Sequence, residues 1–321
     1  MQRLILMSAA LLLLSPPAST QNPPTSLTYP LDVDSVVTWP LPRLLKAIPK
    51  LKGLEPDESQ AELPRILQKV GVNVKTFFEN FPNTASVEKI SMERLAVASG
   101  TGALEWPSAG IRESHTQKFR YLALSRPANE GVGLDEYRTN SKGQVVEPGG
   151  LGVGLCVTKG FVSVPLRFHP EYQAGSTFRY LGRQVINKRQ SHVVAFAQRP
   201  GIARIGQRIS FGTTSLLVLV QGIAWIDASD YQILRMRTDL LPSKENVGPK
   251  RDTTEIEFRT VRFKESTQML WLPYEVAVSV DWRGNVYQNR HRYSDFRLFK
   301  VSTQQKLQAP KEASPDQHLP N

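Results

Sequence analysis

QGIAWIDASDYQILRMRTDLL, residues 221–241, predicts a β-hairpin that is apolar on both of its faces. The turn is expected at Asp227–Asp230, where the two carboxylates would repel each other and favour an open turn. This register pairs Ile226 with Tyr231 and Ala224 with Ile233. One face then carries Gly222, Ala224, Ile226, Tyr231, Ile233 and Arg235, and the other carries Ile223, Trp225, Gln232, Leu234 and Met236. Because a half-solvated antiparallel sheet is polar on one side, both faces of this hairpin are expected to be covered.

Two explanations of this pattern stay open. In the first, the helix that ends in Phe77, Phe78 and Phe81 packs on one face, and another sheet or the N-terminal leader packs on the other. In the second, one face lines an apolar cavity in a curved sheet, with the helix as its lid. LWLPYEVAVSVDW, residues 270–282, poses the same alternatives. The candidate cavity-lining residues therefore come from both stretches: Ile223, Trp225, Leu234, Met236, Trp271 and Tyr274.

The rest of the chain predicts one strong helix followed by many strands. AELPRILQKVGVNVKTFFENF, residues 61–81, repeats apolar residues with the 3.6-residue period of a helix, and Pro82 ends it. After Pro82, short turns separate about eleven apolar-rich segments, which is typical of an antiparallel meander. The expected strands are Val87–Val97, Gln117–Leu124, Leu134–Thr139, Leu155–Phe168, Phe178–Ile186, His192–Gln198, Leu216–Ile226, Tyr231–Leu240, Thr254–Phe263, Leu272–Val280 and Val286–Val301.

The first 20 residues predict a cleaved signal peptide. Arg3 precedes an apolar run, Leu4–Leu14, which small residues and prolines follow. The run is too short for a membrane span, which needs about 20 apolar residues. No cysteine stands near the cleavage region to accept a lipid. The mature protein is therefore expected to be exported, periplasmic or secreted, soluble and not lipid-anchored, with no transmembrane segment after cleavage.

Four parts are expected along the chain. Residues 1–20 form the signal peptide, and residues 21–56 form a proline-rich leader with a short helix at Leu41–Leu51, which docks locally. Residues 57–301 form a single domain that holds the long helix and the strands. Residues 302–321 are polar and contain prolines, so they are expected to form a disordered tail.

The net charge of +11 is spread over predicted strands and is not gathered in one run or on one helix. Nucleic-acid-binding arms cluster their basic residues, so no nucleic-acid partner is expected. The favoured interpretation is that strand arginines coat the solvent face of a sheet. The alternative is an anionic surface or ligand nearby, such as lipid headgroups. These arginines are Arg120, Arg179, Arg183, Arg235, Arg237, Arg259, Arg290 and Arg292.

No local motif points to catalysis, a cofactor or a metal. PGGLGVGLC, residues 148–156, is rich in glycine, but a strand-like segment follows it where a nucleotide site needs a helix. A flexible loop is expected instead. The only cysteine, Cys156, lies in an apolar run and is expected to be a small buried residue. The protein is therefore expected to be non-enzymatic, with no catalytic residues, no cofactor and no metal.

The histidines also lack the spacing of metal ligands. His291 has the most polar neighbourhood, because Arg290, Arg292 and Asp295 lie on the same predicted strand. Strand alternation places His291, Tyr293 and Asp295 on one face and the two arginines on the other. A solvated or cross-strand-paired face is favoured there over a catalytic site.

The order of these elements and the hairpin motif resemble a known family. A signal peptide, an amphipathic helix, a long antiparallel meander and a G-x-x-W-I-D-x-x-x-x-x-I-x-R hairpin are similar to the periplasmic outer-membrane lipoprotein carrier and sorting (LolA-like) superfamily. The matching residues are Gly222, Trp225, Ile226, Asp227, Ile233 and Arg235. FFENFPN, FRYLGRQ, HVVAFAQRP and HRYSDFRLFKV resemble a narrower group of exported bacterial proteins without an assigned activity.

The resemblance implies an α+β, mostly β fold: a strongly curved antiparallel sheet, or incomplete barrel, with helices that pack on or plug its concave face. It also implies that this face holds acyl chains. The favoured hypothesis is an envelope binding protein for a lipid, an acylated protein or another apolar ligand, with a role in lipoprotein or lipid trafficking. The alternative hypothesis is a regulatory or scaffolding protein of the envelope that binds a protein partner and no small ligand.

Overall fold

The computed structural model describes residues 25–30, 32–95, 111–126, 132–146, 160–211, 214–245, 247–264, 266–267, 269–282 and 284–299. The predicted signal peptide, the glycine cluster with Cys156 and the predicted tail at 302–321 lie outside these residues.

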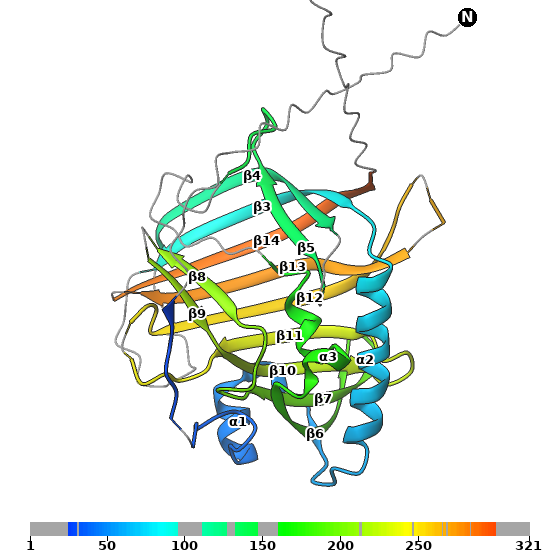
Figure 1. Cartoon of the computed structure of the whole chain (residues 1–321), viewed down its shortest axis with the longest axis vertical. Coiled ribbons are helices and arrows are strands. Elements are labelled where there is room, and N and C mark those ends of the chain that lie inside the picture. The colour runs from blue at the N-terminus through cyan, green and yellow to red at the C-terminus, as the bar shows by residue number, and fades with distance from the viewer. Residues whose placement is uncertain are drawn as a thin grey trace, which may run out of the picture.

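Eleven strands of the described chain form one antiparallel sheet whose two edges, β2 and β5, do not pair with each other (Figure 1). From edge to edge the strands are β2 (Glu55–Pro56), β6 (Ser176–Ile186), β7 (Arg189–Gln198), β10 (Val220–Asp227), β11 (Ile233–Leu240), β12 (Arg251–Arg262), β13 (Met269–Trp282), β14 (Asn285–Leu298), β3 (Thr84–Leu95), β4 (Ile111–Ser125) and β5 (Leu134–Thr139). The sheet curves around the helices in front of it (Figure 1). The predicted mostly β fold, an incomplete barrel of about eleven strands, is therefore confirmed.

Three helices lie on the concave face of the sheet (Figure 1): α2 (Leu63–Glu79), η3 (Val164–Phe168) and α3 (Pro170–Gln173). The predicted helix at 61–81 is confirmed as α2, which buries Ile66, Val70 and Val74 towards the sheet. α2 crosses α3 closely at Gly71, where a Cβ atom would lie 2.7 Å from the Nε2 atom of Gln173. That Nε2 donates hydrogen bonds to backbone carbonyls of both α2 and η3. A side chain at position 71 would displace this amide and separate the helices.

The strand predicted at Leu155–Phe168 is wrong for the part that the structure describes. Gly160–Phe168 holds a turn and the short helix η3 instead. Pro165 lies in the first turn of η3, where its missing N–H leaves no hydrogen bond unmade. In a paired strand the same proline would remove a hydrogen bond from the ladder, so the valines before it, Val162 and Val164, were a misleading signal.

The apolar run at Leu216–Ile226 predicts one strand, but the structure divides it at Leu219. β9 (Thr214–Val218) belongs to a small second sheet with β8 (Gln207–Phe211) and β1 (Thr25–Ser26), whereas β10 begins at Val220. The backbone N–H of Leu219 donates to the hydroxyl of Tyr29 at 2.7 Å and so leaves both ladders. No glycine or proline marks this break, and its partner is about 190 residues away in sequence.

The leader covers the convex face of the sheet at one end. Its helices are α1 (Leu41–Ala47) and η1 (Pro49–Leu51), next to β6 and β7 (Figure 1). Leu44 of α1 packs in one apolar cluster with Ile223 and Trp225 of β10. Ala224 and Ile226, on the other face of β10, belong to the large core beneath α2. The first explanation of the two-sided hairpin is therefore the one that the structure shows: a helix layer covers one face and the leader covers the other.

The register of the β10–β11 hairpin differs from the expected one. Ile226 pairs with Ile233, and Ala224 pairs with Met236, because a bulge lies between Trp225 and Ile226. The extra residue moves Met236 to the concave face, where it is fully buried with Ala224 and Ile226. The expected register had placed Met236 on the face of Trp225.

The two carboxylates of the hairpin turn do not repel each other as expected, because a cation from the neighbouring strand pairs with both. Nε of Arg189, in β7, lies 2.6 Å from Oδ2 of Asp227, and its Nη2 lies 2.7 Å from Oδ2 of Asp230. Asp227 also accepts the backbone N–H of Ser229 at 2.8 Å. The turn is therefore closed and hydrogen-bonded, which a hairpin considered on its own does not reveal.

Leu44→Ala is expected to lower the free energy of unfolding by about 2 to 4 kcal/mol, because Leu44 is fully buried between leader and sheet and its loss leaves a cavity. The neighbouring Leu45 is 41% exposed. Leu45→Ala, the matched control, is expected to change stability by less than about 0.5 kcal/mol. Denaturant unfolding measures both variants, and equal effects in the two would contradict a docked leader.

Candidate apolar binding site

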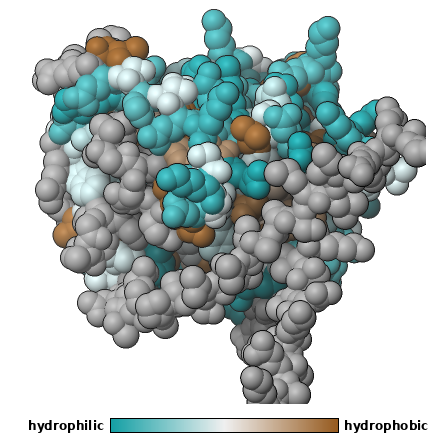
Figure 2. Space-filling view, turned by 90° about the horizontal axis from the view of Figure 1, so that it is seen from above, coloured by the Kyte–Doolittle hydropathy of each residue, from teal (hydrophilic) through white to brown (hydrophobic). Residues whose placement is uncertain are grey.

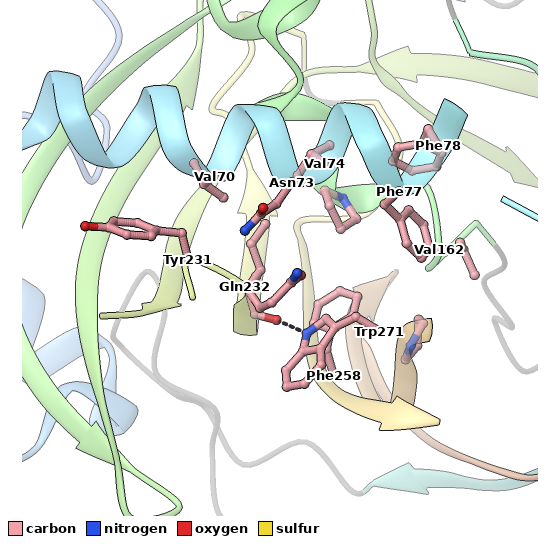
Figure 3. A pocket seen from close by; sticks show the side chains of 13 residues that line it. Val70, Asn73, Val74, Phe77, Phe78, Val162, Tyr231, Gln232, Phe258 and Trp271 are labelled. Carbon is pink, nitrogen blue, oxygen red and sulfur yellow. Dashed lines mark hydrogen bonds between the residues drawn. The ribbon is translucent and has the colours of Figure 1, made fainter. Parts of the chain in front are cut away.

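A narrow apolar crevice lies between α2 and the concave face of the sheet, beside the turn of the β10–β11 hairpin (Figure 3). It contains about 400 Å³ of space, including the part open to solvent. The helical stripe that packs α2 on the sheet also supplies one wall of the crevice, and β11, β12 and β13 supply the other. The principal apolar lining residues are Val70, Val74, Phe77, Ile233, Phe258 and Trp271.

Polar groups at the margin of the crevice tie the helix to the sheet. Nδ2 of Asn73 donates to the backbone oxygen of Asp230 at 2.7 Å, and Nη1 of Arg65 donates to the hydroxyl of Tyr231 at 2.6 Å. The indole N–H of Trp271 donates to a backbone oxygen of β11 at 2.5 Å (Figure 3). With these groups paired among themselves, the crevice offers a ligand mainly apolar surface, which favours an apolar ligand over a charged one.

A second apolar hollow lies beside the crevice on the concave face and contains about 280 Å³ of space, including the part open to solvent. Its lining includes Tyr121, Leu272 and Tyr293. Val162 and Pro273 line both the crevice and this hollow, so they form the wall between the two. Val162 belongs to the segment Gly160–Ser163, which leads into η3, and the position of this segment therefore decides whether the two spaces are joined.

The carboxylate of Glu136, in β5, holds that segment in place. It accepts the backbone N–H groups of Val162 and Ser163, each at 3.3 Å, and the hydroxyl of Tyr121. Burial raises the pKa of Glu136, and these three hydrogen bonds partly offset the effect. The carboxylate is thus a hydrogen-bond acceptor at the start of η3, where backbone N–H groups have no helical partner.

A second buried carboxylate, Glu88 of β3, organises the sheet behind the hollow. Glu88 is fully buried and accepts hydrogen bonds from Arg138 Nε at 2.5 Å, His291 Nδ1 at 2.8 Å and the Tyr293 hydroxyl at 2.8 Å. Burial alone would raise the pKa of Glu88, but the bond from His291 and the charge of Arg138 together lower it to about 2. The group is therefore a carboxylate–guanidinium ion pair with satisfied acceptors, which stabilises a buried charge that would be costly alone.

His291 is the part of this cluster that the sequence singled out. The structure confirms that His291 and Tyr293 face one side of β14, with exposed Arg290 and Arg292 on the other. His291 and Tyr293 bind the same carboxylate across strands, which agrees with the favoured interpretation of a paired face. Burial lowers the pKa of His291, and the nearby Glu88 opposes that effect.

The six candidate cavity-lining residues do not gather in one place. Of the six, only Trp271 lines the crevice. Ile223 and Trp225 lie on the convex face beneath the leader, and Met236 is fully buried in the main core. Leu234 is buried within β11. Tyr274 is 36% exposed, with the guanidinium of Arg259 4.0 Å above its ring. Contact of any of the six with a ligand stays a prediction.

Sequence reasoning missed most of the lining because it searched the hairpin and not the helix. Val70, Val74 and Phe77 were already visible as the stripe of the predicted helix, and they supply one wall. Glu88 was visible as a charged residue at an inward position, because it lies two residues before Ile90 and therefore on the same, buried face of the strand. Glu136 had no comparable signal, since its partners come from a segment that was predicted to be a strand.

Comparison with known proteins gives a likeness of fold. No protein-family model and no curated protein sequence matches the chain. Among solved structures, the chain is similar to a Vibrio parahaemolyticus domain described as an outer membrane lipoprotein-sorting protein, with a TM-score of 0.35, 12% identity, and coverage of 72% of this chain and 91% of the other. It is also similar to a LolA superfamily protein from Nitrosomonas europaea, with a TM-score of 0.32, 11% identity and coverage of 74% and 94%.

A third similar structure is a DUF1329 family protein from Desulfovibrio piger, with a TM-score of 0.37, 9% identity, and coverage of 73% of this chain and 92% of the other. At these identities and TM-scores, no ligand, activity or residue role is transferred from the three structures to this chain. In the part of the chain that the structure describes, no helix combines the length and apolar character that crossing a bilayer requires.

Glu136→Gln is expected to loosen the segment Gly160–Ser163, because an amide has one acceptor oxygen and would turn its NH₂ towards one of the two backbone N–H groups. Hydrogen exchange at the amides of Val162 and Ser163 should become about tenfold faster or more. Asp135→Asn, which alters the neighbouring and more exposed carboxylate paired with Arg126, is the control and should leave both rates unchanged. Unchanged exchange in Glu136→Gln would show that this carboxylate does not hold the segment.

His291→Asn is expected to make stability less dependent on pH as the pH falls from about 7 to about 5, through the ordinary pKa of histidine. Because the folded-state pKa of His291 is lowered, the unfolded chain binds its proton first as the pH falls, and the folded state loses stability. The asparagine amide can still donate to Glu88 but does not titrate. Between about pH 7 and pH 5, the decrease in the free energy of unfolding should be smaller by about 1 kcal/mol in the variant than in the parent protein. Glu88, with its pKa lowered to about 2, loses its own contribution only below this window, so an identical loss in both proteins would refute the assignment.

Proposed function

We propose that this protein is an exported, non-enzymatic binding protein of the bacterial envelope that holds a lipid acyl chain or another apolar ligand beneath α2. The observation that supports the proposal is the apolar crevice between α2 and the concave face of the open sheet. The unfilled space inside the crevice is only about 30 Å³, so a ligand would enter by displacing side chains of the lining, and the polar groups lie at the margin.

The second hollow extends the proposed site. Movement of Val162, on the Gly160–Ser163 segment, would join the crevice to the neighbouring hollow and lengthen the proposed site. The segment rests on hydrogen bonds from two backbone N–H groups to one side chain, Glu136, and is not part of a strand ladder. It is therefore the part of the lining best suited to yield to a ligand.

The polar chemistry near the site supports binding in preference to catalysis. The two buried carboxylates nearest the crevice and the hollow are engaged by the protein itself, Glu88 by Arg138, His291 and Tyr293, and Glu136 by backbone N–H groups. A third buried carboxylate, Asp252 of β12, has its pKa raised to about 7 by burial, but it lines neither space. A general base or nucleophile needs a free position towards its substrate. On this proposal, the ligand is a lipid or the acyl group of an acylated protein, and the role is lipoprotein or lipid trafficking.

The narrowness of the crevice favours the second candidate, an envelope regulatory or scaffolding protein that binds a protein partner and no small ligand. The two candidates differ in what the native protein carries. Protein purified from the exported fraction without detergent is expected to release bound lipid that mass spectrometry detects at a substantial fraction of one molecule per chain. Lipid-free protein that crosslinks to one specific envelope protein would support the second candidate and refute the first.

Gln232→Trp is expected to weaken binding of a fluorescent fatty acid by about tenfold or more, because the indole would fill the crevice from the hairpin side. Val72→Trp is the matched control. Val72 is 54% exposed on α2, the helix that forms one wall of the crevice, but it does not line the crevice itself. A tryptophan there should therefore leave the affinity within about twofold. Equal affinities for the two variants, with thermal unfolding confirming that both are folded, would contradict binding in the crevice.

A further inference from the structure

At the end opposite to the leader, no described helix or strand covers the convex face of the sheet. Five exposed basic side chains from three adjacent strands, β14, β3 and β4, gather there, and we refer to them as the basic face. They are Lys89, Lys118, Arg120, Arg290 and Arg292. Seen from above, hydrophilic side chains project from one side of the molecule in this region (Figure 2).

The strand register sets three of these cations side by side. Arg292 of β14 pairs with Lys89 of β3, and Lys89 pairs with Lys118 of β4, so the three form one row across the sheet. Neighbouring strands are about 5 Å apart, and like charges directly opposite each other destabilise a sheet. The row therefore reduces stability in isolation, and an anionic partner would relieve the repulsion.

Few carboxylates neutralise the basic face. Glu275 lies 3.6 Å from Arg290 and 3.4 Å from Arg292, and Glu93 lies on the same side of the sheet. Within the part of the chain that the structure describes, no carboxylate lies within ion-pair distance of Lys89 or Lys118. The face therefore has an excess of positive charge, in contrast to β11 and β12, where Arg235 and Arg237 pair with glutamates.

The surface between these cations is hollowed. Short side chains, Ser91, Ala277 and Ser279, line a shallow groove of about 1010 Å³ that is open to solvent, and Lys89, Arg290 and Arg292 flank it. The groove has room for phosphate-bearing groups between long cationic side chains. Its floor is formed by strands and is therefore rigid and presents the cations as an extended array.

We propose that the basic face binds the surface of an anionic phospholipid membrane. A single small anion would be recognised by cations that converge on one point, whereas these cations spread over three strands and match an array of headgroups. The five cations lie opposite one another or opposite Ser91, Ala277, Thr139, Glu275 and the partly buried Val87, so the attraction is mainly electrostatic and the protein remains at the headgroup level. The face is on the opposite side of the sheet from the crevice, so membrane contact and ligand binding use different surfaces.

The test is co-sedimentation of the exported protein with lipid vesicles. Mass spectrometry first checks the N-terminus of the protein. Vesicles of phosphatidylcholine with about 30% phosphatidylglycerol should bind the protein at about 0.05 M salt, and binding should disappear at about 0.5 M salt. Vesicles of phosphatidylcholine alone should not bind it. Equal binding to both vesicle types would overturn the proposal. No binding to the anionic vesicles would also overturn it, and this is the result expected if the face binds an acidic protein instead.

The variant Lys89→Gln/Lys118→Gln/Arg120→Gln should bind anionic vesicles with an affinity that is at least about tenfold lower, since each cation near such a surface contributes substantially to the attraction. It should also unfold at an equal or higher temperature than the parent protein, because the like-charge row is removed. Unchanged vesicle binding by this folded variant would refute the proposal. If the variant does not fold, the salt and lipid dependence of the parent protein decides the question.

A matched control removes the same charge elsewhere. Lys50, Lys52 and Lys69 are exposed and lie on the leader and α2, away from the basic face. Lys50→Gln/Lys52→Gln/Lys69→Gln should keep vesicle affinity within about twofold of the parent protein. An equal loss in the control and in the basic-face variant would show that net charge alone drives the binding, and would overturn the assignment to this face.

Discussion

Strand β10 is buried on both faces along its whole length, and this constraint accounts for the layers of the structure. A strand with apolar residues such as Ile223, Trp225 and Ile226 on both sides gains stability only if each side is shielded from water. α2 and η3 shield the concave side, and the leader shields the convex side. At this end the structure therefore has three layers, which are the helices, the sheet and the leader. The leader layer is missing at the other end, where β14, β3 and β4 turn polar and charged residues to solvent.

The concave face changes character along the sheet. Around β10 and β11 it is filled by apolar side chains, whereas around β3, β5 and β14 it contains the Glu88–Arg138 ion pair and the carboxylate of Glu136. Buried polar groups of this kind are tolerated only when nearly all of their hydrogen bonds are made, and they then specify one arrangement of their partners. The crevice lies between the two regimes, where apolar packing against α2 gives way to a segment held by polar contacts. This position explains why an apolar lining borders a segment that is held by polar contacts.

Much of the fold could be predicted from local patterns in the sequence. The period of α2, the strands after Pro82 and the apolar character of both hairpin faces are local properties, and the structure agrees with them. Two of the errors arose where distant partners decide the local structure. The break at Leu219 depends on Tyr29, and the closed hairpin turn depends on Arg189. The crevice could not be located from the hairpin alone, because its position depends on where α2 crosses the sheet.

The docked leader also has a consequence for the order of folding. The hydrogen bonds between its residues 36–52 and side chains of β6 and β10 join residues that are 132 to 185 positions apart in sequence, from Lys52 and Gln184 to Val36 and Gln221. Since a chain is synthesised from its N-terminus, the apolar side chains of the leader are made long before β6, β7 and β10 exist to cover them. Contacts of such long sequence separation form slowly, so the leader docks as a late step. Until then, its own apolar residues and the convex side of β10 remain accessible to chaperones and proteases.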